Sequence, residues 1–179
     1  MRRLILAAAL TSSACALPAE RAPVVTTTLV SADASTSLMV GDQIFLEQRS
    51  EPAREGMDRI VNITLRHNDG RRIAFHEANH APHDLFVQRP NGALAQVMAL
   101  GEAETPRLYH AASGEGAESA FFCGPQGPAA IGMFESADGA VRIVGLRQPF
   151  QVETLANGEL NAVPYSPDQV CARLNFRRS

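Results

Sequence analysis

The chain contains no lysine: all 16 of its basic residues are arginine. This absence excludes mechanisms in which a lysine amine forms a Schiff base, and it excludes nucleotide binding through the lysine of a P-loop. Cysteine is also scarce, with three in 179 residues and no CxxC motif, so a redox centre of that type is not predicted. Ser113, in Ala112-Ser113-Gly114, does not lie in the nucleophile elbow of a serine hydrolase.

An excess of positive charge is missing as well. The first 19 residues hold two arginines and no acidic residue, so the rest of the chain has 14 arginines, 19 acidic residues and a net charge of −5. Nucleic-acid binding needs a clustered basic face, and such a partner is therefore not expected. The remaining roughly 160 residues are enough for one domain with a sizeable core.

Residues 1–19 have the features of an export signal. Arg2 and Arg3 precede a short apolar run, Leu4 to Leu10, and small residues follow. The run is far shorter than the roughly 20 residues of a membrane-spanning helix. We therefore predict an exported protein, located in the bacterial periplasm or held at the outer membrane as a lipoprotein.

Two ways of processing this signal stay open. Ala14-Cys15-Ala16 and Leu17-Pro18-Ala19 both offer the small-x-small pattern of ordinary signal cleavage. Ser12-Ser13-Ala14-Cys15 resembles a bacterial lipobox, although a leucine is usual where Ser12 stands. The resemblance implies that Cys15 is acylated and becomes the N-terminus, and this lipid would be the only membrane attachment.

Either route leaves two cysteines, Cys123 and Cys171, in an oxidising compartment. We predict a disulfide between them. In the chain-entropy model such a bond stabilises the fold by about 3–4 kcal/mol.

Four dipeptides typical of tight hairpin turns lie between β-prone segments: Asp69-Gly70, Asn91-Gly92, Asp138-Gly139 and Asn157-Gly158. Treated as two-residue turns, they fix which residues of the flanking segments face each other. The predicted pairs include Glu135 with Arg142, Phe134 with Ile143, Leu65 with Ala74, Ile63 with His76, Phe86 with Val97, and Leu155 with Leu160. The predicted class is all-β: a single antiparallel β-sandwich or a small β-barrel.

The remaining segments divide the chain further. Residues 20–42 are either a tether or a first strand, and residues 43–179 are the β-domain, in which Gln43 to Gln48 is predicted as a strand. Gly101 to Ser119 is predicted to be a long loop. Ser166 and Pro167 are typical of a helix start, so a short C-terminal helix is expected over Pro167 to Leu174.

One segment suggests metal chemistry: His76-Glu77-Ala78-Asn79-His80, followed by His83. The first five residues match the HExxH of zinc metallopeptidases, in which a helix places both imidazoles on one face. Here a predicted hairpin strand precedes the motif and Pro82 follows it, which disfavours a helix. A looser site for zinc or copper, using His76, His80 and His83, needs no helix.

Two functions follow from these observations. The first is a non-catalytic exported β-domain, without a cofactor, that binds an envelope protein or a small ligand through loops at one end. The second is a metal-binding protein or zinc metallopeptidase that uses the His76 segment. We prefer the first, because histidine spacing alone fixes no geometry.

Overall fold

The structure is a computed structural model that describes residues 23–50, 61–78, 94–101, 104, 106–112, 120–149, 151–163 and 165–179. The strands are β1 (Val24–Ser31), β2 (Gln43–Ser50), β3 (Val61–His67), β4 (Arg72–Glu77), β5 (Arg107–Ala111), β6 (Ala130–Glu135), β7 (Ala140–Leu146), β8 (Val152–Thr154), β9 (Leu160–Ala162) and β10 (Val170–Arg178). The helices are α1 (Ala34–Val40), α3 (Leu94–Val97) and the 3₁₀ turn η1 (Pro167–Gln169). The all-β prediction is confirmed.

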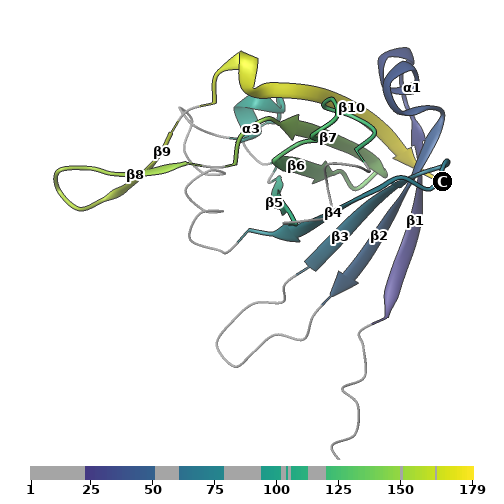
Figure 1. Cartoon of the computed structure of the whole chain (residues 1–179), viewed down its shortest axis with the longest axis horizontal. Helices are drawn as coiled ribbons and strands as arrows, with labels where there is room; N and C mark the ends of the chain where they lie inside the picture. Colours follow the sequence, from purple (N-terminus) through teal and green to yellow (C-terminus); the bar gives the residue numbers. More distant parts are fainter. Residues whose placement is uncertain are drawn as a thin grey trace, which may run out of the picture.

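Eight of these strands form a closed antiparallel barrel in the order β1-β10-β7-β6-β5-β4-β3-β2 (Figure 1). From β1 to β7 each strand pairs with the next in sequence, and β10 closes the barrel between β7 and β1. Strands β8 and β9 form a separate hairpin that projects away from the barrel (Figure 1). Of the two architectures the sequence allowed, the barrel is the one observed, and residues 20–42 contribute β1 and α1 to it.

Three of the predicted turns lie where expected, but each predicted register is wrong by one residue. The β3–β4, β6–β7 and β8–β9 loops contain three residues instead of two, and each ends on a glycine with φ of +93°, +82° or +82°. Glu135 therefore faces Val141, not Arg142. A three-residue loop needs positive φ only at its last position, where the glycine stands, whereas a two-residue primed turn needs it at both. In two of the loops the acidic or amide side chain accepts a hydrogen bond from the residue after the glycine, at 3.0 Å.

The other local predictions have mixed outcomes. Asn91-Gly92 lies outside the described residues, but Val97, the predicted strand partner of Phe86, belongs to helix α3. The predicted long loop 101–119 contains strand β5. The predicted helix from Pro167 is limited to η1 and its capping box at Ser166. Residues from Val170 to Leu174 are in β10 and pair with β7, and the end of the same strand, Phe176 to Arg178, pairs with β1 and closes the barrel.

The core has two parts, one on each side of the barrel wall. Because neighbouring residues of a strand point to opposite faces, one row of each strand fills the interior, as eight-stranded barrels allow. The interior residues include Leu29, Ile44, Leu46, Ile63, Leu65, Ile73, Phe75, Tyr109, Ile131, Ile143, Leu174 and Phe176. Outside the wall, Leu94 and Met98 of the α3 region pack over Leu108, Ala130, Val144 and Leu146. None of the described helices is long and apolar enough to cross a membrane.

Candidate functional site

The two ends of the barrel differ in chemistry. At one end, the predicted pair Cys123 and Cys171 is joined, with 1.92 Å between the sulfurs and 5.0 Å between the Cα atoms. Phe121 and Phe122, just before Cys123, are buried and belong to the interior cluster. We call this the disulfide end. Its aromatic and sulfur groups make it an extension of the core.

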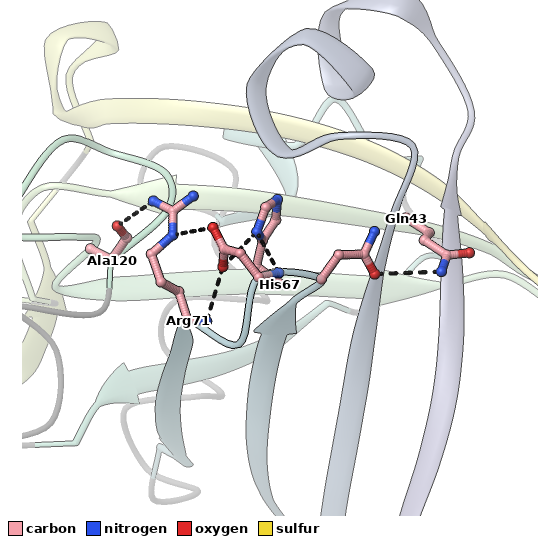
Figure 2. A network of polar contacts seen from close by, with 6 residues as sticks. Gln43, His67, Arg71 and Ala120 are labelled. Atoms are coloured by element: carbon pink, nitrogen blue, oxygen red, sulfur yellow. Dashed lines mark hydrogen bonds and ion pairs between the residues drawn. The ribbon is translucent and has the colours of Figure 1, made fainter.

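A polar network also holds the disulfide end together (Figure 2). Asp69, in the β3–β4 turn, accepts hydrogen bonds from the backbone and side chain of Arg71, and it lies 2.8 Å from His67 Nδ1. These contacts, first the backbone bond from Arg71 and then His67, lower the pKa of Asp69 to about 2. Arg71 also donates to Ala120 O at 3.2 Å, and the His67 ring packs against Phe121. The turn is thus attached to the loop that carries Cys123.

At the opposite end, the inward rows of five strands finish in polar residues. Each lies two positions beyond a buried residue of the interior, and they are Gln48 of β2, Glu77 of β4, Arg107 of β5, Glu135 of β6 and Arg178 of β10. We call this the polar end. It combines four charged groups of both signs with an amide.

The two carboxylates of the polar end form ion pairs of different closeness. Arg178 lies with Nε 2.6 Å from Glu135 Oε1, and its Nη2 donates to Glu135 Oε2, which makes a two-pronged pair. Glu77 accepts a hydrogen bond from Val61 N at 2.9 Å, and its other oxygen lies 3.7 Å from Arg107 Nη1. The Arg107 side chain is 54% exposed. It is therefore the least engaged cation of the polar end.

Tyr109 lies beneath these charges and is fully buried. Within the described part of the chain, no group meets the geometry of a hydrogen bond to its hydroxyl, although the Arg107 guanidinium lies close enough to interact with it. Burial, and then the negative charge of Glu77, raise the pKa of Tyr109 to about 12, while Arg107 acts in the opposite direction. A buried hydroxyl without a partner is costly. It is also available to a ligand that reaches it.

A hollow of about 630 Å³ opens at this end, lined by Gln48, Arg107, Met133, Glu135, Ser136 and Ala137. Its size is within the range of small-molecule sites, and barrel ends are common places for them. The donors nearby are the Arg107 guanidinium and the Tyr109 hydroxyl, and the acceptors are the carboxylates of Glu77 and Glu135. The arrangement can hold a polar ligand by hydrogen bonds and charge.

The histidine segment is only partly described. His76 and Glu77 belong to β4, so they point to opposite sides of the wall, and the helix of a zinc-peptidase motif does not form at these two residues. His76 Nδ1 lies 2.8 Å from Asn62 Oδ1, and His76 faces His110 on β5. His80, His83 and Cys15 lie outside the described residues. Among the residues that are described, no group of three or more potential metal ligands gathers.

Sequence reasoning missed most of the polar end. Tyr109 lies in the predicted long loop Gly101 to Ser119, which was not expected to hold a strand, so its burial in β5 was not predicted. Glu135 was paired with Arg142, whereas its partner is Arg178, 43 residues away. Two alternations, Ile131-Met133-Glu135 and Ile73-Phe75-Glu77, are the signals that could have indicated carboxylates at the ends of inward rows.

Comparisons with protein-family models, with curated proteins and with solved structures find no match for this chain.

Proposed function

We propose that the protein is an exported, non-catalytic β-barrel domain that binds an envelope protein or a small ligand at the polar end. The observation that carries the proposal is the buried Tyr109 hydroxyl, which has no hydrogen-bond partner of good geometry among the described residues. It lies close to the charges of Arg107 and Glu135, and both of these residues line the hollow of about 630 Å³. A binding site holds such a group more readily than a core does, because a bound acceptor supplies the missing hydrogen bond.

The charges indicate what kind of group is bound. Arg107 is exposed and only loosely paired, so it can turn to a carboxylate or another anionic group of the ligand. Glu135 is already held by Arg178 and contributes to the shape of the site more than to charge balance. The favoured ligand group is therefore a hydrogen-bond acceptor with negative charge, set between Arg107 and Tyr109.

NMR spectroscopy of the ¹⁵N-labelled protein tests this proposal. Acetate, glycine, glutamate and glucose are titrated separately at constant ionic strength. We expect acetate and glutamate to shift amide signals of β5 and of the end of β6, and glucose to have no effect. Arg107→Gln and Tyr109→Phe should weaken the response, and Arg147→Gln, on an exposed residue after β7, serves as the matched control.

A response in β5 and β6 that is lost in both variants but kept in Arg147→Gln supports binding at the polar end. No response, or one that Arg147→Gln weakens as much as Arg107→Gln does, contradicts a site for such groups. An envelope protein that binds at the polar end must contact Arg107, so Arg107→Gln should weaken the binding of such a partner as well.

The second function is metal binding by His76, His80 and His83, with zinc or copper. The observation that favours it is the position of His76 on the outer face of β4, opposite His110. Elemental analysis of the purified protein tests it. Stoichiometric metal that is lost in both His76→Ala and His80→Ala supports the site, and a metal-free protein of full stability ends it.

Export and lipidation are tested separately by the intact mass of the mature chain. Cleavage after Ala16 or Ala19 gives an unmodified chain that starts at Leu17 or Glu20. Acylation gives a chain that starts at Cys15 with added acyl mass, and Cys15→Ser then abolishes that mass. A chain that retains residues 1–19 contradicts export.

A further inference from the structure

A second hollow lies on the outer face of the barrel, away from the polar end. Its volume is about 550 Å³, and it runs over β7 and β10 between the residues just before α1 and those just after α3. The strands contribute Arg142, Arg173, Asn175 and Arg177 to its lining. The two flanking segments contribute Asp33, Met98 and Ala99. We call it the arginine groove.

The strand register brings the three arginines together. Arg142 of β7 faces Asn175 of β10, so it lies midway between Arg173 and Arg177 on the adjacent strand. Arg173 and Arg177 are roughly 13 Å apart along their strand, and Arg142 is about 5 Å to the side. Arginine side chains are long enough for all three guanidinium groups to reach one ligand in the groove.

Among the residues that the structure describes, no carboxylate pairs with these positive charges. Arg142 donates to Ala99 O at 3.4 Å and Arg173 donates to Val97 O, so both contact the end of the α3 segment. In the described part of the protein none of the three arginines forms an ion pair, and the side chain of Arg177 forms no hydrogen bond.

Two of the described carboxylates lie in the surroundings. Asp33 accepts hydrogen bonds from Thr36 N at 2.8 Å and from Asn175 Nδ2 at 2.7 Å. Asp138, in the β6–β7 turn, is engaged with Ser136, and the charge of Arg177 is a minor influence on it. Three cations and one occupied carboxylate line the groove of a chain whose overall charge is negative.

We propose that the arginine groove binds an oxyanion of the phosphate class. Guanidinium groups match phosphate oxygens in pairs, and several around one anion are typical of phosphate recognition. No described residue uses the guanidinium donors of Arg177, and Arg142 and Arg173 each keep donors beyond the one used on a carbonyl. The phosphate group can belong to a free anion or to the headgroup of a lipid.

Titration with inorganic phosphate and with pyrophosphate tests the proposal, with chloride used to keep the ionic strength constant. Amide signals of β7 and β10 should shift on titration of the ¹⁵N-labelled protein. Arg177→Gln should weaken binding about ten-fold, because a charge-assisted hydrogen bond is lost. Arg72→Gln, an exposed arginine on the outward row of β4, is the matched control and should bind as the unchanged protein does.

Co-sedimentation with vesicles separates the two sources. Binding to phosphatidylglycerol vesicles but not to phosphatidylcholine vesicles, reduced by Arg177→Gln, assigns the groove to a lipid headgroup. Phosphate or pyrophosphate binding without vesicle binding assigns it to a free anion. If neither probe binds, or if Arg72→Gln weakens binding as much as Arg177→Gln does, the proposal is overturned.

Discussion

Gly145 lies directly against Cys123: a Cβ atom built on Gly145 would be 2.6 Å from Cys123 Sγ. The same Cβ would lie 3.2 Å from Cys171 Sγ and 3.2 Å from the Phe122 ring. Real side chains do not approach a sulfur so closely, and the two sulfurs of a disulfide cannot rotate away independently. The bond at this end of the barrel therefore requires a residue without a side chain in the neighbouring strand.

Gly145→Ala should destabilise the protein by about 1–3 kcal/mol, the usual cost of forcing extra atoms into a packed core. Urea denaturation measures it. Gly101→Ala is the control, since a Cβ there would meet only Glu104 Oε2 at 3.7 Å. In a Cys123→Ala, Cys171→Ala background the cost of Gly145→Ala should shrink, because smaller side chains replace the sulfurs. An equal cost in both backgrounds would show that the sulfurs do not cause it.

Reduction of the Cys123–Cys171 bond should lower the free energy of unfolding by about 3–4 kcal/mol, since the cysteines are 48 residues apart. Urea denaturation with and without a phosphine reductant measures the loss. Alkylation of the native protein before reduction should leave both thiols unmodified, with a mass two hydrogens below that of the reduced chain. Free reaction of both cysteines in the native protein would contradict the bond.

The two tyrosines should ionise at an abnormally high pH. The pKa of Tyr109 is raised to about 12, and burial raises the pKa of Tyr165 as well. An absorbance titration at 295 nm should show no tyrosinate near pH 10 in the native protein and both residues ionising near pH 10 in urea. If one tyrosine of the native protein ionises near pH 10, and the same transition is seen in Tyr109→Phe, the pKa of Tyr165 is not raised and the prediction fails for that residue.

The same shift makes stability depend on pH. A tyrosine with a raised folded pKa stays protonated in the native state while the unfolded chain ionises, so its contribution is complete below about pH 10 and is lost as pH rises toward 12. For Tyr109 the loss amounts to about 2–3 kcal/mol. Tyr109→Phe should make the decline of stability between pH 10 and 12 shallower, and an unchanged decline would contradict this role of Tyr109.

Ala99→Gly should stabilise the protein by about 0.5–1 kcal/mol. Ala99 follows the α3 segment with φ of +53°, a left-handed conformation that glycine adopts without strain. Ala140→Gly, in strand β7 and without positive φ, is the control and should destabilise by a similar amount. Thermal denaturation of both variants gives the comparison. A loss of stability in Ala99→Gly would mean that Ala99 is not strained.

The arginines of the groove show why some features follow from sequence and others do not. Asp-Gly and Asn-Gly between β-prone segments predict turns, because a glycine is needed wherever φ is positive. The disulfide was predictable because only two cysteines remain after processing. Arg142, Arg173 and Arg177 gave no signal, since their proximity depends on which residue of β10 faces which residue of β7.

The sequence by itself therefore determined the all-β class, the place of three turns and the disulfide partners, all of which depend on local backbone preference or on a count. The loop length of each hairpin, and with it the register of every pair, depended on the tertiary structure, because the same dipeptides fit two- and three-residue loops and a one-residue slip moves the apolar row of a strand to the other face of the wall. Tertiary structure also decided that Val170 to Leu174 extend instead of coiling, since β10 is required between β7 and β1 to complete the hydrogen bonding of the barrel. The polar end exists only in that closed form, where residues of five strands, far apart in sequence, finish at one place around Tyr109.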